Sequence, residues 1–320
     1  MKGSSKNKKK IHMEYNFFIN CYKYIILIII FSIFIYSTSL KRVEVISKNT
    51  HYIFTFWEPR NSMPGYLSLC VKTWKKYFPV YYKIVILDYS NIIEYLGVKL
   101  VNQILCKDMT LPIQADAIRV AILHKYGGYW LDTDILIINS KFIKMFYGSD
   151  LIMFGDSNDK YKQHIGFIYA SSNSTILKAW LNIIIYKVKI YKYRLLLYRF
   201  FRTKYFEKLY YQSRNWSYLG NGILDNLVNN ISEKEFKRIE QDDAFALPDQ
   251  TLLKGSIIQR YINFYFSSVK AMPNLMKSKG VLYLHNSWSP QKYKKMSEAQ
   301  FLRQDIMLAH LISNALYGIN

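Results

Sequence analysis

The chain has 320 residues, with 44 Lys and Arg against 22 Asp and Glu, which gives a formal net charge of +22 at pH 7. Hydrophobic residues make up 51% and charged residues 21%, and the mean hydropathy is -0.05. These values exclude a disordered chain and a protein with many membrane spans. Three cysteines are too few for a disulfide scaffold or a Cys-rich zinc module.

The first predicted element is a hydrophobic helix at residues 24–40, which contain no charged side chain. About 17 to 20 apolar residues are enough to span the bilayer core. The preceding residues 1–23 form a basic tail with Lys2, Lys6, Lys8, Lys9, Lys10 and Lys23. This charge predicts a single-pass anchor with the N-terminus in the cytoplasm. Two alternatives stay open: a buried helix of the domain, or a signal peptide cleaved near Ser37-Thr38-Ser39.

After a short stem at residues 41–51, strand patterns alternate with helical patterns. Strands are predicted at residues 52–57, 82–87, 129–131, 135–138, 151–154, 165–170 and 281–285. Helices are predicted at residues 66–78, 115–126, 175–187 and 298–317. This order is typical of an α/β domain with a mostly parallel sheet and flanking helices. We therefore assign residues 52–320 to one α/β domain behind the hydrophobic helix.

Residues 186–214 interrupt this regular alternation. They contain nine Lys and Arg residues and a single acid, Glu207. One broad apolar face of a helix would be formed by Leu195, Leu196, Tyr198, Phe201, Tyr205 and Leu209. The segment is predicted to be a basic amphipathic insertion. It would lie either on an anionic membrane surface or against the domain, with its basic face in water.

Asp132-Thr133-Asp134, a DxD sequence, follows directly after an apolar strand. Two carboxylates at this position can offer oxygen ligands to Mg²⁺ or Mn²⁺. Open α/β sheets bind their ligands beyond the carboxyl ends of the strands. A metal there would neutralise the charge of a departing nucleotide diphosphate. The DxD therefore predicts a metal and nucleotide site.

The residues before the DxD support this prediction. Asp116 and Arg119 are three positions apart on a predicted helix, so they share one face. Gly127 falls where a helix end favours a left-handed residue, and Gly128 allows a sharp turn into the strand. Helix, turn, strand and carboxylates thus form one compact unit. For Asp116 and Arg119, a purely local ion pair is the alternative interpretation.

The combination of A-D-x-x-R, Y-G-G and D-x-D resembles the sugar-binding glycosyltransferases with a DxD motif. These include the capsular polysaccharide synthesis proteins and the Golgi-type mannosyltransferases (glycosyltransferase family 32). Residues 54–58, residues 84–88 with Trp74, and residues 285–290 extend the resemblance to residues 52–290. It implies a GT-A fold, which is a Rossmann-like domain, and sugar transfer from a nucleotide sugar with retention of configuration.

The resemblance also implies roles for individual residues. Asp132 and Asp134 would face the metal and the diphosphate, with His285 or Asn286 as a further ligand. Asp116 and Arg119 would hold the ribose and the sugar of the donor. The other residues assigned to donor binding are Tyr126, Trp57, Ser287 and Trp288. Asp132, Asp134 and Arg119 would be the catalytic residues.

Two positions depart from the pattern of the family. Gly220-Asn221-Gly222 stands where relatives often have a Gly-Pro-Gly turn, which leaves the backbone geometry there open. His164 stands where an Asn is more usual, which leaves the acceptor contacts open. Neither departure affects the expected metal site.

The implied activity is that of a hexosyltransferase that uses Mn²⁺ or Mg²⁺ and a UDP- or GDP-hexose. The acceptor would be a glycan or glycolipid at a membrane. The domain would face the Golgi lumen in a eukaryote, and in a bacterium its side stays open. A non-catalytic, basic, membrane-associated protein that binds acidic polymers would explain the charge but not the acidic motif.

Two further classes are disfavoured by the sequence. A phosphotransferase of the haloacid dehalogenase type usually has a Thr at the position of Leu136. A nucleic-acid partner is not expected, because the chain has no zinc, RNP or basic-zipper pattern.

Overall fold

The computed structural model describes residues 51–155, 163–215, 217–229, 231–240, 255–268 and 280–318. Residues 50–320 form one compact unit. The basic tail, the predicted anchor at residues 24–40 and most of the stem lie outside the described residues, so those assignments stay predictions. Within the described ranges, no helix is both long and apolar enough to cross a membrane.

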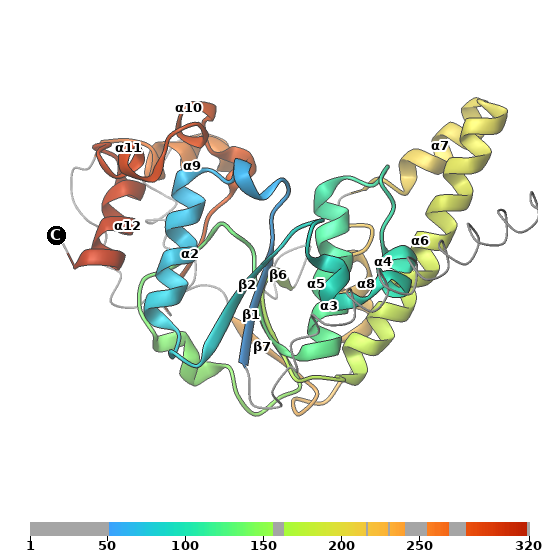
Figure 1. The fold of residues 1–320 in the computed structure, drawn as a ribbon, viewed down its shortest axis with the longest axis horizontal. Coiled ribbons are helices and arrows are strands. Elements are labelled where there is room, and N and C mark those ends of the chain that lie inside the picture. The colour runs from blue at the N-terminus through green and yellow to red at the C-terminus, as the bar shows by residue number, and fades with distance from the viewer. Residues whose placement is uncertain are drawn as a thin grey trace, which may run out of the picture. The chain divides into compact units, whose positions relative to one another are not determined.

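A six-stranded sheet forms the centre of this unit (Figure 1). Its strands, in spatial order, are β2 (Tyr82–Leu87), β1 (His51–Phe56), β3 (Gly128–Leu131), β6 (His164–Ala170), β5 (Leu151–Gly155) and β7 (Phe236–Glu240). Three of the five pairings are parallel, and β6 runs antiparallel to both of its neighbours. A second sheet pairs β4 (Ile135–Ile137) with β8 (Val281–Tyr283). The predicted α/β class with a mostly parallel sheet is confirmed.

Both faces of the sheet are buried. Successive side chains of a strand point to opposite faces, and in β1 Ile53 belongs to the cluster that contains Trp74, whereas Phe54 belongs to the cluster of Ala117 and Trp180. Both strand residues are fully buried. This explains why the strands are continuous apolar runs rather than alternating ones.

Helices cover the two faces, as Figure 1 shows. On one side lie α3 (Ile92–Leu96), α4 (Val98–Ile104), α5 (Leu111–Tyr126), α6 (Thr175–Phe201), α7 (Lys204–Gln212) and α8 (Asn221–Leu227). On the other lie α2 (Gly65–Tyr77), α9 (Ile257–Tyr265), α10 (Gln291–Lys294), α11 (Glu298–Leu302) and α12 (Met307–Tyr317). Short 3-10 turns are η1 (Arg60–Ser62), η2 (Lys141–Met145) and η4 (Asn286–Trp288).

Two of the predicted helices differ from the expectation. The predicted helix at residues 175–187 continues as α6 to Phe201, because buried apolar residues keep their helical spacing through Val188, Tyr191 and Leu195. The single helix predicted at residues 298–317 is two helices, separated by a turn in which Ile306 is extended and buried. Strand β7 and the helices α3, α4, α8, α9 and α10 were not among the predicted elements.

Candidate functional site

A two-glycine turn connects α5 to β3. Gly127 and Gly128 have φ values of 66° and 91°, a region that side chains disfavour. At Gly128 a Cβ atom would lie 2.4 Å from the carbonyl oxygen of Tyr52 in β1. Only glycine allows the chain to turn this close to β1, and the turn aligns β3 so that it ends at the DxD. The predicted left-handed residue at the end of the helix is confirmed at Gly127.

The DxD itself is held in a tight turn between the two sheets. The backbone N–H of Asp132 donates to Gly166 of β6 at 2.7 Å, and that of Ile135 donates back to Asp132 at 3.0 Å. The backbone N–H of Leu284, after β8, donates to the carbonyl of Asp134 at 3.0 Å. The buried Trp74 of α2 donates its Nε1 to the carbonyl of Ile135 at 2.7 Å. Hydrogen bonds from several elements thus fix the backbone of this turn, and with it the positions of Asp132 and Asp134.

Arg119 joins the helix to the first carboxylate. Its Nη2 donates to Oδ1 of Asp132 at 2.8 Å, and its Nη1 lies 3.3 Å from Oδ1 of Asp116. The guanidinium also lies over the Trp130 ring, 5.1 Å from its centroid, and Trp130 Nε1 donates to the same oxygen of Asp132 at 2.7 Å. The purely local Asp116–Arg119 pair is therefore too narrow an interpretation, because Arg119 also bonds to the DxD.

The Arg119 side chain is buried but incompletely satisfied. The residue is 3% exposed, and within the described residues its Nε and Nη1 have no hydrogen-bond acceptor. Both nitrogens are buried, and Nη1 has only the ion pair with Asp116 in place of a hydrogen bond. Buried polar groups in proteins are normally hydrogen-bonded, so this cation is held under unusual conditions beside the carboxylates.

Burial alters the acidity of the two carboxyl groups beside this cation. Burial raises the pKa of Asp116 to about 7; the charge of Arg119 opposes the shift and that of Asp132 adds to it. Burial also raises the pKa of Asp134 to about 7; Asp132 adds to the shift, and the hydrogen bond from Asn286 opposes it. Perturbed carboxyl groups clustered in a cavity are typical of functional sites.

The turn after β8 closes the site from the side of Asp134. The backbone N–H of Asn286 donates to Oδ2 of Asp134 at 3.0 Å, and the hydroxyl of Tyr66 donates to Oδ1 of Asn286 at 2.6 Å. Next to it, the rings of His285 and Trp288 stack with centroids 3.8 Å apart. The segment of residues 285–290 therefore contacts the DxD through Asn286, and its predicted role over a diphosphate stays a prediction.

A cavity of about 450 Å³ lies over these groups, within the range usual for small-molecule sites. It is lined by Phe56, Trp57, Glu58, Leu111, Pro112, Ala115, Asp116, Arg119, Trp130, Asp132, Thr133, Asp134, Ile165 and Asn286. Six residues named from the sequence meet here: Trp57, Asp116, Arg119, Asp132, Asp134 and Asn286, the last as the alternative to His285. The cavity lies beyond the carboxyl ends of β1 and β3, where open α/β sheets bind ligands.

The other predicted donor residues are not part of this lining. Tyr126 lies at the far end of α5, about 15 Å from Asp116 at 1.5 Å of rise per residue. Its hydroxyl donates to the carbonyl of Tyr95 at 2.7 Å, and its ring packs against Phe54, so it stabilises the core. Ser287 is exposed, and the Trp288 ring packs on His285 and Tyr261 instead.

The two departures from the family pattern, Asn221 in the Gly220–Gly222 turn and His164, lie next to residues of the cavity. A Cβ atom at Gly220 would lie 2.5 Å from Oδ2 of Asp116, so this position has room only for glycine. The His164 ring lies against Gly166 and packs on Tyr283, 3.9 Å between centroids. Burial, with the charges of His285 and Arg119, lowers the pKa of His164 to about 3. The imidazole is therefore neutral at physiological pH.

A divalent metal fits the carboxylates of the DxD. The contacts described above use only Oδ1 of Asp132 and Oδ2 of Asp134, so one oxygen of each lies outside them. No group of three His, Cys, Asp or Glu side chains in the described parts of the chain could hold a metal. Mg²⁺ is commonly held by one or two carboxylates together with substrate phosphates. A site with two Asp ligands suits that mode, and His285 as a third ligand stays a prediction.

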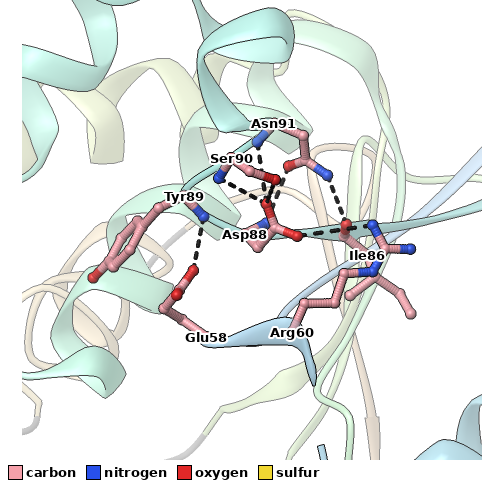
Figure 2. Close-up of polar contacts among 7 residues, drawn as sticks. All are labelled: Glu58, Arg60, Ile86, Asp88, Tyr89, Ser90 and Asn91. Carbon is pink, nitrogen blue, oxygen red and sulfur yellow. Dashed lines mark hydrogen bonds and ion pairs between the residues drawn. The ribbon is translucent and has the colours of Figure 1, made fainter. Parts of the chain in front are cut away.

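A second acidic turn follows β2, and Figure 2 shows it. Oδ1 of Asp88 accepts hydrogen bonds from the backbone N–H and hydroxyl of Ser90 at 2.8 and 2.5 Å, and from the backbone N–H of Asn91 at 3.1 Å. Arg60 lies 3.8 Å from Oδ2. Burial favours the neutral acid, but the hydrogen bonds and Arg60 outweigh it and lower the pKa of Asp88. Glu58, which lines the cavity, accepts from the backbone of Tyr89 at 2.9 Å.

An α/β domain with acidic side chains and an arginine beyond its strand ends belongs to the broad class of ligand-binding open-sheet folds. The sequence profile of the capsular polysaccharide synthesis protein family matches residues 6–247, and the chain therefore belongs to this family. This membership supports a role in polysaccharide synthesis and a glycosyltransferase-like activity. Comparison with curated proteins and with solved structures found no match.

Sequence reasoning left one contact of the cavity undecided and missed others. His285 and Asn286 were alternatives, and it is Asn286 that contacts the DxD, through its backbone N–H, which no sequence pattern reveals. Pro112 was missed as well, although a proline in the first turn of a helix marks where α5 begins, at the cavity. For Glu58, the only signal in the sequence was its position just after a predicted strand.

Proposed function

We propose that the chain is a metal-dependent glycosyltransferase that moves a hexose from a nucleotide sugar to a glycan or glycolipid acceptor with retention. Family membership supports the general activity. The observation that carries the proposal is the convergence of Asp116, Arg119, Asp132 and Asp134 on one cavity. Retention, and a UDP- or GDP-hexose as the donor, rest on the resemblance in sequence.

The carboxylates of the DxD suit the binding of a nucleotide diphosphate through Mg²⁺ or Mn²⁺. A bound divalent cation would offset the negative charge that develops on the diphosphate as the bond to the sugar breaks. Asp132 and Asp134 would hold the cation, because both line the cavity at the end of β3. The backbone hydrogen bond from Asn286 keeps Asp134 in place.

Arg119 and Asp116 would orient the donor. The guanidinium is fixed by Asp132, by Asp116 and by the Trp130 ring, so it does not need to reorganise when an anion binds. Asp116 offers a hydrogen-bonding carboxyl group to sugar or ribose hydroxyls. Trp57, also on the cavity wall, offers an aromatic face for a base or sugar ring.

Membrane attachment through residues 24–40 belongs to the same proposal. The full-length protein should stay with carbonate-washed membranes. A protein that washes off freely would contradict the anchor without affecting the proposed reaction.

The direct test is donor turnover by the full-length protein. A panel of UDP- and GDP-hexoses is incubated with Mn²⁺ or Mg²⁺, and release of the nucleoside diphosphate is measured with and without EDTA. We expect release from one donor class, abolished by EDTA and restored by excess Mn²⁺. No turnover with any donor, together with tight binding of acidic polysaccharide, would instead support the non-catalytic basic protein.

A further inference from the structure

Helix α6 carries two apolar faces, of which only one is covered. The inner face is buried and contains Ile184, Val188, Tyr191 and Leu195. The exposed large apolar side chains on α6 are Tyr186, Tyr193, Leu196 and Phe200, with Phe201 at its end. At about 3.6 residues per turn, the first four lie opposite the buried face. A helix on the surface of a soluble domain normally has a polar outer face, so this second face calls for an explanation.

The exposed apolar side chains continue around the turn into α7. Phe200 is 79% and Tyr205 67% exposed, and Arg202 between them adopts a left-handed conformation that reverses the chain. The two helices are held together by ring stacking, with Phe201 on Phe206 at 5.2 Å between centroids. In Figure 1 the C-terminal end of α6 and the start of α7 project outward at the edge of the helical layer. We call residues 193–208 the α6–α7 tip.

Cations surround these side chains. Exposed basic residues on α6, on α7 and just after it are Lys189, Arg199, Arg202, Lys204, Lys208 and Arg214. Arg199 pairs with Asp108 at 2.7 Å. Among the described residues, no ion pair involves Arg202, Lys204 or Lys208. The tip thus presents unpaired positive charge next to exposed aromatic rings.

The combination of exposed apolar side chains and unpaired cations at the tip favours one class of partner. An acidic polymer would use the charges but would gain little from exposed Phe and Leu side chains. A second copy of this chain, docking tip to tip, would bring like charges together. Aromatic rings beside Lys and Arg are typical of segments that lie at the interface of a membrane, where rings enter the headgroup region and cations meet lipid phosphates. The surface of an anionic bilayer satisfies both features.

We propose that the α6–α7 tip docks on a bilayer that contains anionic lipids. Phe200, Phe201 and Tyr205 enter the headgroup region, and Arg202, Lys204 and Lys208 face the lipid phosphates. This contact is separate from the predicted anchor at residues 24–40, and it stands whether or not the chain transfers sugar. It would hold the domain at the membrane surface by a second, independent contact.

The test places a bimane label on the tip of the full-length chain. Phe200→Cys is made in a background with Cys21→Ser and Cys106→Ser, and the control label is at Val80→Cys, a fully exposed site before β2. Each protein is added to vesicles of phosphatidylcholine alone or mixed with phosphatidylglycerol, with or without bromine atoms on the acyl chains. We expect bromine to quench most of the emission of the tip label in the anionic vesicles only, and to leave the control label bright.

A charge-reversal pair tests whether the cations matter. Arg202→Glu, Lys204→Glu and Lys208→Glu together should abolish the quenching of the tip label. Lys75→Glu, Lys144→Glu and Lys234→Glu change the net charge equally at exposed sites elsewhere and should leave the quenching intact. An unquenched tip in wild type, or equal quenching in neutral vesicles, would overturn the proposal. A label whose emission shifts with protein concentration in the absence of lipid would show docking of a second copy instead.

Discussion

Two acidic turns lie at the same edge of the sheet, after β2 and after β3, on either side of β1. After β2, Asp88 receives three hydrogen bonds from its own turn, and its pKa is lowered. After β3, Asp134 is half-buried, lines the cavity, accepts a backbone hydrogen bond from Asn286 and has a pKa of about 7. A carboxylate that its own turn satisfies stabilises the fold. A carboxylate with a raised pKa on the wall of a cavity is suited to bind a ligand.

The largest effect is expected from removing a carboxylate at the second turn. Asp134→Asn should lower metal-dependent donor turnover by about a hundredfold or more, because one electrostatic partner of the developing charge is lost. The melting temperature without ligand should stay near wild type or rise, since a partly desolvated charge is removed and the Asn286 N–H keeps an acceptor. Coupled-assay kinetics and thermal unfolding measure both. Normal turnover with an unchanged response to Mn²⁺ would show that Asp134 is not a metal ligand.

A smaller loss is expected for Arg119→Lys. A lysine cannot reach Asp116 and Asp132 at once with a planar fork, and misplacement of a positioned group by about 1 Å can cost about a hundredfold in rate. We expect turnover to fall by about tenfold to a hundredfold. The matched control is Arg60→Lys, because Arg60 faces Asp88 from a side chain that is 58% exposed, and its turnover should stay close to wild type. An equal loss of turnover in Arg119→Lys and Arg60→Lys would contradict the view that only the DxD turn takes part in the reaction.

Gly220→Ala should have an intermediate effect on activity. The added methyl group would lie 2.5 Å from Oδ2 of Asp116, so it must push that carboxyl group or its own backbone aside. Overpacking of this kind costs about 1–3 kcal/mol of stability, and a displaced Asp116 should weaken donor binding severalfold. Gly222→Ala in the same turn meets the backbone of Ser217 instead, so it should destabilise without a specific rise in KM. An unchanged KM for the donor in Gly220→Ala would show that Asp116 does not contribute to donor binding.

The smallest effect on activity is expected at the first turn. Asp88→Asn removes charge-assisted hydrogen bonds to Ser90 and Asn91, which should lower the free energy of unfolding by about 1–2 kcal/mol while turnover stays near wild type. Because folding lowers the pKa of Asp88, its contribution is present above its unfolded pKa of about 3.9 and is lost as pH falls through the folded pKa. Denaturant unfolding of both proteins should therefore differ at pH 7 and converge in acid. A constant difference across pH would show that the charge of Asp88 is not involved.

Much of the site follows from local sequence. Asp116 and Arg119 share a helix face, the glycine pair requires a turn, and the DxD must then follow the next strand. These are short-range constraints, and the structure agrees with them. Trp57 was assigned to donor binding, and it lines the cavity and also packs against the core.

Other features depend on tertiary packing that no local pattern reveals. Tyr126 lies between Arg119 and the DxD in sequence. It is nevertheless about three helical turns from Asp116, and its ring packs in the aromatic core near Phe54. The antiparallel direction of β6 between β3 and β5 was likewise not indicated by any local pattern. The sequence predicted a single broad apolar face for this segment. Only the structure shows that one part of it is buried against the domain and another part, the outer face of α6, is exposed.

The central claim is that the DxD turn, and not the Asp88 turn, binds a nucleotide diphosphate through a divalent metal. Isothermal titration of UDP and GDP into the full-length protein, with and without Mn²⁺, tests it most directly. We predict that one nucleotide binds more tightly with Mn²⁺ in wild type and in Asp88→Asn, and that Asp134→Asn abolishes this dependence on Mn²⁺. Binding that ignores Mn²⁺ in wild type, or that keeps its Mn²⁺ dependence in Asp134→Asn and loses it in Asp88→Asn, would contradict the account.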